Sequence, residues 1–195
     1  MTFEDYYRQL LEWEGFARTP LIAVWNKGEV RDIGDDMADA VAASKLKTID
    51  APIRPDSTNQ SVGNQVEDFF VSQVNGFLKR FEIKNCAGAG YPDKQLCFRT
   101  GDRKFLLELK ATGQWNPSDS NRRVLTSSSK KLRECFTAPI NHLLLTVCYE
   151  IAGGKLRIRN VRLDFIQPAT EVNVRLEASV NHKSLSAGSH PWKLI

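Results

Sequence analysis

Apolar residues recur at helical spacing in three segments of the N-terminal half of the chain. Residues 2–15, TFEDYYRQLLEWEG, carry this pattern behind a threonine that can cap the helix. Residues 34–47, GDDMADAVAASKLK, carry a weaker version of it. The clearest helix is predicted within residues 61–81, capped by Ser61 or Asn64, and its apolar stripe comprises Val66, Phe69, Phe70, Val74, Phe77 and Leu78.

The second half of the chain is dominated by strand patterns. Residues 94–99, KQLCFR, and residues 104–112, KFLLELKAT, flank a Gly101-Asp102 step, which predicts a β-hairpin. Three further strands are predicted, and the first of them is nearly all apolar, which is typical of a strand buried on both faces. They are residues 141–151, 153–166 and 171–180.

The order of these elements indicates the fold class. Residues 48–64, TIDAPIRPDSTNQSVGN, read as a connector between an N-terminal helical region, residues 1–56, and a main body, residues 57–195. Helices, a hairpin, a further helix and then strands follow one another along the chain. This order predicts an α/β or α+β fold with a central mixed β-sheet flanked by helices.

Composition is that of an ordinary globular protein. The 195 residues are 42% hydrophobic and 26% charged, and no apolar run approaches the roughly 20 residues that span a bilayer. The N-terminus is acidic and aromatic, unlike a signal peptide. We therefore expect a cytoplasmic protein with no membrane partner. The cysteines lack zinc-site spacing and are expected to be small buried hydrophobes: Cys86, Cys97, Cys135 and Cys148.

Charge is distributed unevenly along the chain. The net charge is +4, yet residues 1–60 carry more acidic than basic residues, so the basic excess lies in the remainder. A basic surface on one part of a fold is the footprint of a polyanion partner, although a solvated face of mixed charge gives the same count.

The hairpin brings an acid and a basic group close to a second acid. If Gly101-Asp102 are the two turn residues, Asp93 lies opposite Lys110 and is a diagonal neighbour of Glu108. Directly opposite Cβ atoms are about 5 Å apart and diagonal ones roughly 7–8 Å. Side chains alternate along a strand, so Glu108 and Lys110 share one face. We expect the three side chains to converge.

This trio suits hydrolysis of a phosphodiester. Two carboxylates a few ångströms apart repel each other unless a cation lies between them, and oxygen ligands suit Mg²⁺. The carbonyl of Leu109 is a candidate for a further ligand. Lys110 is then placed to hydrogen-bond the attacking water or to stabilise charge on the phosphate, and a nearby metal would lower its pKa.

Pro92-Asp93 followed by Glu108-Leu109-Lys110 resembles the motif of the PD-(D/E)xK nuclease superfamily. The resemblance implies a restriction-endonuclease-like core, Mg²⁺ bound by the motif acids, and a lysine that assists the hydrolytic water. It also implies an acid from the preceding helix, here Glu67 on the Gly63–Phe81 helix. A helix at Asn121–Phe136 and a buried strand at His142–Ile151 match the elements that follow the motif.

Simpler explanations exist for these residues. Glu108 and Lys110 would form a same-face ion pair on a half-exposed strand, worth under about 1 kcal/mol, with Asp93 a turn residue after proline. Glu67 would be a surface acid that compensates the helix dipole, and Asp68 is the alternative helix ligand. His142, His182 and His190 lack the paired spacing of a histidine-metal nuclease.

Clusters of basic and polar residues beyond Lys110 favour contact with double-stranded DNA. The candidates for this contact are Gln114, Asn116, Arg122, Arg123, Lys130 and Lys131, with Asn181, His182 and Lys183 in the tail. Their alternative is an ordinary solvated loop and helix.

Within the superfamily, a short chain resembles a type II restriction endonuclease. That class implies Mg²⁺-dependent, sequence-specific cleavage of double-stranded DNA to 5′-phosphate ends, by a homodimer that matches a palindromic site. The helices of residues 1–56 would then serve as a dimer interface or an arm along the DNA. The alternatives are a repair or recombination nuclease, such as a nicking enzyme or junction resolvase, and a non-catalytic DNA-binding domain.

Overall fold

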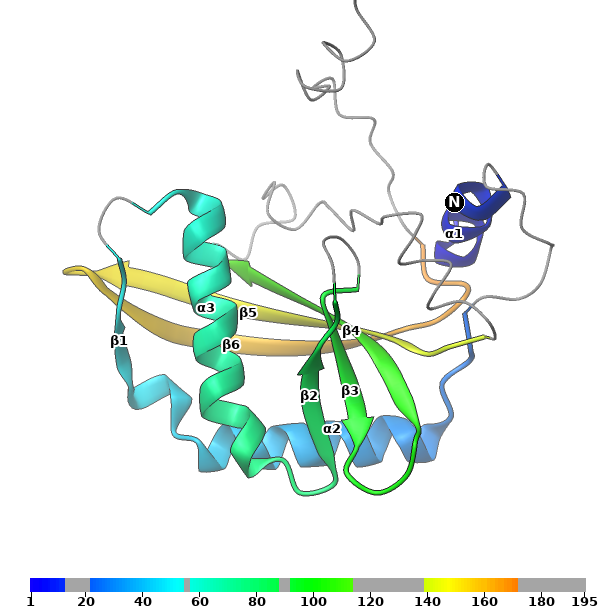
Figure 1. Ribbon diagram of the computed structural model, residues 1–195, viewed down its shortest axis with the longest axis horizontal. Helices are drawn as coiled ribbons and strands as arrows, with labels where there is room; N and C mark the ends of the chain where they lie inside the picture. The colour runs from blue at the N-terminus through cyan, green and yellow to red at the C-terminus, as the bar shows by residue number, and fades with distance from the viewer. Residues whose placement is uncertain (13–21, 55–56, 88–91, 114–138, 172–195) are drawn as a thin grey trace, which may run out of the picture.

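The computed structural model of the chain describes residues 1–12, 22–54, 57–87, 92–113 and 139–171 (Figure 1). These residues form three α-helices and two short 3₁₀ helices: α1 Phe3–Glu12, α2 Lys27–Ala43, α3 Asn59–Val74, η1 Leu46–Thr48 and η2 Asn75–Phe77. They also form six strands: β1 Asp50–Pro52, β2 Phe81–Asn85, β3 Lys94–Phe98, β4 Lys104–Thr112, β5 His142–Ala152 and β6 Lys155–Ile166.

One mixed sheet holds all six strands, in the order β1-β6-β5-β4-β3-β2. The pairing of β4 with β5 is parallel, and the other four strand pairs are antiparallel. The fold is therefore α+β with a central mixed sheet, as predicted. In Figure 1, β5 and β6 form the long ribbons of the sheet, while α3 crosses in front of them and α2 runs along the lower edge of the view.

Alternation along the central strands creates one apolar face. The cross-strand pairs Leu107–Leu143, Leu109–Leu145 and Ala111–Val147 point to this side, and these side chains are at most 6% exposed. The core cluster joins them to buried residues of α2 and α3. Because α2 and β1 belong to the predicted N-terminal region of residues 1–56, that region contributes to the same core as the main body.

The apolar residues of β6 that contact this core form two sets, and the alternation of side chains shifts by one residue between them. Val161, Leu163 and Phe165 are spaced by two, and so are Leu156 and Ile158, but Ile158 and Val161 are three apart. A bulge between the Cys148–Asn160 and Tyr149–Ile158 pairs leaves one extra residue on β6. The extra residue allows both sets of apolar side chains to face the core.

The helix α3 differs from its prediction at both ends. Its cap is Thr58, whose Oγ1 accepts from the Ser61 N–H at 3.2 Å, so the predicted caps Ser61 and Asn64 are wrong. The helix ends at Val74 instead of Phe81 because the Asn75 side chain pairs with the main chain of Ile83, accepting from its N–H at 2.7 Å and donating to its carbonyl at 3.0 Å. The segment that follows is β2, which the sequence did not predict.

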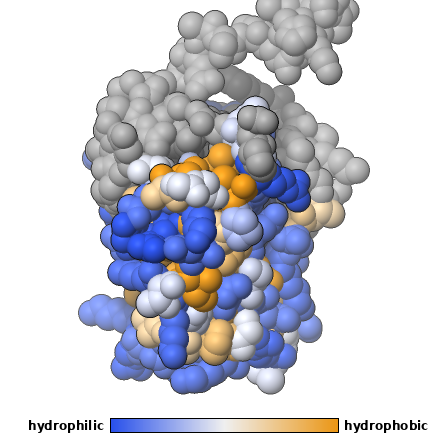
Figure 2. All heavy atoms as spheres, turned by 90° about the vertical axis from the view of Figure 1, so that its left-hand side faces the viewer, coloured by the Kyte–Doolittle hydropathy of each residue, from blue (hydrophilic) through white to orange (hydrophobic). Residues whose placement is uncertain are grey.

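Two other predicted boundaries change. The helix α2 begins at Lys27, where Asn26 Oδ1 accepts from the Glu29 N–H at 2.8 Å, and it ends at Ala43 instead of continuing to residue 47. The predicted connector contains β1, which pairs with the start of β6 and joins it through an ion pair between Asp50 and Arg157, at 2.6 Å. Seen from the side that carries β1, the described surface is largely hydrophilic with a patch of hydrophobic residues between the charged ones (Figure 2).

At the other end of the sheet, α1 is attached to the segment that follows β6. The capping role predicted for Thr2 is confirmed, since its Oγ1 accepts from the Asp5 N–H at 3.1 Å. The Phe3 N–H donates to the Thr170 carbonyl at 2.8 Å, and the Phe3 ring packs edge-on against His142 at 5.4 Å.

Among the helices of the described residues, none is long and apolar enough to cross a membrane. The cysteines Cys86, Cys97 and Cys148 are half-buried instead of fully buried.

A buried carboxylate fixes the start of β2. Asp36 on α2 is 5% exposed, and its two oxygens accept the backbone N–H groups of Lys79, Arg80 and Phe81 at 2.9, 3.0 and 3.3 Å. We expect Asp36→Asn to lower the free energy of unfolding by about 2 kcal/mol, because an amide oxygen replaces only one acceptor and its NH₂ faces donors. Urea denaturation measures this, with exposed Asp35→Asn as the control. An equal effect in both variants would contradict it.

Candidate active site

The β3–β4 hairpin has a different register from the predicted one. The structure pairs Lys94 with Leu107 and Cys97 with Lys104, and the Phe98 N–H donates to the Arg103 carbonyl at 3.1 Å. The turn is therefore a four-residue loop, and the predicted two-residue turn with Asp93 opposite Lys110 is wrong. The shift is two residues, and side chains alternate with a period of two, so every side chain keeps its predicted face.

Asp93, Glu108 and Lys110 do come together. Glu108 is only 2% exposed, and its Oε1 lies 2.5 Å from Lys110 Nζ. Its Oε2 accepts from the main-chain N–H of Asp93 at 3.3 Å, while Asp93 Oδ2 lies 3.8 Å from Lys110 Nζ. The half-buried Lys110 thus lies between two carboxylates, and the main chain of Asp93 holds Glu108 in place.

The pairing of β3 with β4 ends beside this cluster, and this determines what the carbonyl of Leu109 faces. The register of β3 with β4 ends at Lys94–Leu107. The Leu106 N–H donates to the Asn141 carbonyl, at 3.0 Å, so the peptide groups of Leu106 and of every second residue after it face β5. Those of Leu107 and Leu109 therefore face the β3 side. The Leu109 carbonyl points to where β3 pairing has stopped, beside Asp93.

Glu67 on α3 belongs to the same electrostatic cluster. Burial raises its pKa from 4.5 to about 7; the charge of Lys110 lowers it, and the charges of Asp93 and Glu108 raise it. These perturbing charges are the predicted site residues, so α3 brings its acid to the hairpin. The helix-dipole explanation does not account for this environment, because the acid is partly buried among other charges.

Burial, together with the attraction between the two groups, sets the pKa values of Glu108 and Lys110. Burial raises the pKa of Glu108 to about 7, Lys110 opposes that rise, and Asp93 adds to it. Burial alone would lower the pKa of Lys110, but the charge of Glu108 and its hydrogen bond to Lys110, aided by Asp93 and Glu67, raise it overall. The lysine is thus a firmly charged ammonium group in this structure. The reduced pKa expected from a neighbouring metal applies only when the metal is bound.

Oxygen donors dominate the cluster, which bears on the expected Mg²⁺. Within the described ranges, no three His, Cys, Asp or Glu side chains are already arranged as a metal-ligand group. Three carboxylates within one electrostatic cluster, together with a main-chain carbonyl, nevertheless fit a hard divalent cation by donor type and charge. In this structure the ammonium of Lys110 neutralises part of that charge.

One charged residue near the site was missed by sequence reasoning. Lys94 is 8% exposed, and its Nζ donates to Asn85 Oδ1 at 3.1 Å. Its charge also lowers the pKa of Glu67. The alternation of side chains could have predicted its burial. Lys94 lies on the same face of its strand as Leu96 and Phe98, which is the face toward the core.

The predicted DNA-contacting residues lie outside the described residues, and so does the helix predicted at Asn121–Phe136. The residues concerned are Gln114, Asn116, Arg122, Arg123, Lys130, Lys131, Asn181, His182 and Lys183.

Comparison with known proteins adds no family assignment. Neither a protein-family model nor a curated protein sequence matches this chain. The geometry and charge of the site are therefore the basis for inferring a function.

Proposed function

We propose that this protein is a Mg²⁺-dependent nuclease of the PD-(D/E)xK type, with a restriction-endonuclease-like core, that cleaves double-stranded DNA at specific sequences and leaves 5′-phosphates. The observation that carries the proposal is the buried Glu108 carboxylate held between the Asp93 main chain and Lys110 Nζ. A surface ion pair on a half-exposed strand does not require a 2% exposed carboxylate, so the simpler explanation fits less well.

The chain's own residues have distinct roles in this proposal. Asp93, Glu108, the Leu109 carbonyl and Glu67 would hold the cation, which when bound supplies charge stabilisation at the phosphate and lowers the pKa of water. Lys110 donates hydrogen bonds from an ammonium placed beside both carboxylates, so it orients the water and stabilises negative charge on the phosphate oxygens. The Asp93 N–H fixes one oxygen of Glu108 and keeps its carboxylate aligned.

The expected partner is double-stranded DNA. The basic and polar residues predicted to contact it precede β5 and follow β6 in the sequence. Because the two-fold symmetry of a homodimer matches a palindromic site, we place a homodimeric restriction endonuclease before the alternative of a repair or recombination nuclease. The three site residues Asp93, Glu108 and Lys110 together favour a nuclease over a non-catalytic DNA-binding domain, which needs no buried acid beside a lysine.

Cleavage of phage and plasmid DNA tests the proposal. We expect discrete fragments with Mg²⁺ and none with EDTA, and we expect Glu108→Gln to give none because an amide cannot supply a carboxylate to the cation. The matched control is Glu82→Gln, on the strand β2 that pairs with the same hairpin, which should cut normally. Cleavage confined to branched DNA would identify a resolvase. Binding without cleavage on every linear, supercoiled and branched substrate would contradict the nuclease proposal.

A further inference from the structure

The outer edge of β6 is largely unoccupied by other described strands. On that side, the described residues pair β6 only with β1, over Lys155–Arg157. In Figure 1, β6 extends well beyond the short β1. The remaining part, Ile158–Ile166, presents a long edge, and such an edge is a template for pairing with another strand.

Hydrogen-bond directions show which residues of this edge face outward. Since the Asn141 carbonyl faces β4, the next residue, His142, and every second residue after it on β5 face β6. Their partners on β6 are the even-numbered residues, including Arg162 and Asp164. The peptide groups of Val161, Leu163 and Phe165 therefore point away from β5. In agreement, the Val161 N–H donates at 2.9 Å to the side chain of Asn160 instead of to a β5 carbonyl.

The sequence of this edge is complementary to itself. An antiparallel copy centred on Leu163 places Arg162 opposite Asp164 of the second copy and Asp164 opposite its Arg162. The same register places Val161 opposite Phe165, and it makes Leu163 a hydrogen-bonded pair with its own counterpart. Opposite charges and paired apolar residues directly across two strands both stabilise a sheet. Within one chain, Arg162 also pairs with Asp164, at 2.6 Å.

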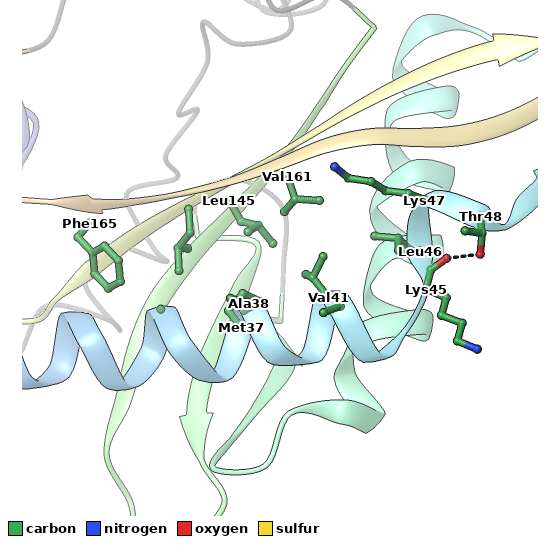
Figure 3. Close-up of a pocket in the computed structure, with 13 residues that line it drawn as sticks. Met37, Ala38, Val41, Lys45, Leu46, Lys47, Thr48, Leu145, Val161 and Phe165 are labelled. Carbon is green, nitrogen blue, oxygen red and sulfur yellow. Dashed lines mark hydrogen bonds between the residues drawn. The ribbon is translucent and has the colours of Figure 1, made fainter.

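Beside the edge lies an apolar groove between the sheet and α2. It encloses about 700 Å³, and Leu145, Val161 and Phe165 extend into it from the sheet (Figure 3). Its α2 side is formed by small and apolar residues, among them Gly34, Ala38 and Ala42 at four-residue spacing. A second strand added at β6 would project its own apolar side chains to this face and cover the groove.

We propose that this surface, made of the β6 edge and the α2 groove, binds a second copy of the chain and joins two sheets through antiparallel β6–β6 pairing. The occupant is specified by the complementarity of Val161–Phe165 to itself. The expected dimer interface in residues 1–56 is then refined to α2 together with β6. This inference does not depend on the nuclease proposal, because no site residue takes part in the pairing.

The joined sheet has a consequence for the site. A two-fold axis perpendicular to the sheet leaves Glu108 and Lys110 of both copies on the same face. Five inter-strand spacings of about 4.8 Å separate the two β4 strands, so the sites lie roughly 24 Å apart. Both sites can thus face one ligand from the same side.

Charge-reversal variants and sedimentation of the full chain test the interface. Asp164→Arg alone places two arginines against two arginines, and Arg162→Asp alone places aspartates against aspartates, so we expect each to weaken the dimer by about tenfold or more. An equimolar mixture should regain a heterodimer, because one strand then presents two arginines and the facing strand two aspartates. Each variant alone loses the pair within its chain, and mixing cannot repair that loss. The control is Lys84→Glu on β2, at the opposite edge of the sheet.

A second measurement covers the case in which the charge variants fold poorly. Leu163→Cys should form an intermolecular disulfide under mild oxidation, since paired Cα atoms about 5.5 Å apart suit that bond. A wild-type monomer at every concentration, charge variants that dimerise normally, or Leu163→Cys without a crosslink would overturn the proposal. A monomer would leave the edge to the strand predicted at residues 171–180.

Discussion

Replacing Lys110 with alanine is expected to slow DNA cleavage by about 10³-fold while DNA binding stays close to that of the wild-type protein. The ammonium lies 2.5 Å from Glu108 Oε1 and 3.8 Å from Asp93 Oδ2, so it is the cation closest to the carboxylates in the described part of the chain. In the proposed mechanism, its loss removes the group that orients the attacking water. Single-turnover cleavage with Mg²⁺ and a gel-shift assay in EDTA separate catalysis from binding.

A second effect of this variant distinguishes a catalytic from a merely structural lysine. The charge of Lys110 lowers the pKa of Glu108, so without it that pKa rises above about 7. Residual cleavage should therefore increase toward higher pH more steeply than wild-type cleavage. Lys110→Arg keeps the charge but not the compact ammonium, so it should restore the pH profile without restoring the rate. The control is Lys104→Ala, at the exposed start of the same strand. Lys110→Ala activity within tenfold of wild type would exclude the proposed role.

Glu67→Gln is expected to stabilise the metal-free protein at pH 8 by about 3 kcal/mol and to leave its stability near pH 4.5 nearly unchanged. Burial raises the pKa of Glu67 from 4.5 to about 7, and each pKa unit corresponds to about 1.4 kcal/mol. The folded protein thus binds this proton more tightly than the unfolded chain. The free energy of unfolding therefore falls as pH rises from 4.5 to 7, and glutamine removes that loss.

Other groups titrate in the same range, so only the difference between variant and wild type is informative. Glu108 has the same sign as Glu67, whereas burial lowers the pKa of His142 to about 3, so stability is lost as pH falls below 6.5. Both groups remain in the variant. The contribution of His142 therefore cancels in the comparison, whereas that of Glu108 cancels except for its coupling to Glu67. Urea denaturation in EDTA across this range gives the difference. Asp68→Asn, on the exposed side of α3, should show none.

Added Mg²⁺ gives this comparison a functional readout. If Glu67 helps to hold the cation, Mg²⁺ should stabilise the wild-type protein more than Glu67→Gln and should reverse their order of stability at pH 8. The variant should also cleave DNA more slowly, because it lacks one of the carboxylates proposed to hold the cation. Equal stabilisation of both proteins by Mg²⁺ would remove Glu67 from the cation site.

The sequence predicted the convergence of the site better than its detailed pairing. Faces follow from a period of two, so an error of two residues in the hairpin register still left Glu108 and Lys110 on one side with Asp93 nearby. The hydrogen bond from the Asp93 main chain to Glu108 depends on the true register, and no pattern in the sequence predicts it. The environment of Glu67 depends on how α3 crosses the sheet, which spacing along one helix does not show.

Element boundaries were missed where long-range contacts override local preference. Helical spacing continues through Phe77 and Leu78, but Asn75 binds Ile83 and Asp36 binds the chain at residues 79–81, so the segment turns and becomes β2. Similarly, the Asp50–Pro52 segment looks like a connector until β6 is present to pair with it. Both corrections come from partners distant in sequence.

The bulge in β6 gives Arg159 an importance that its side chain does not reveal. Cys148 pairs with Asn160 and Tyr149 with Ile158, so Arg159 is the residue that the opposite strand skips. Leu156 and Ile158, at most 1% exposed, reach the core only because that residue intervenes. Substitutions at position 159 change a solvent-exposed side chain. Deleting the residue instead moves the side chains of one end of the strand to the opposite face of the sheet. What this position contributes to the fold is length, and a change of chain length there is far more damaging than a change of residue type.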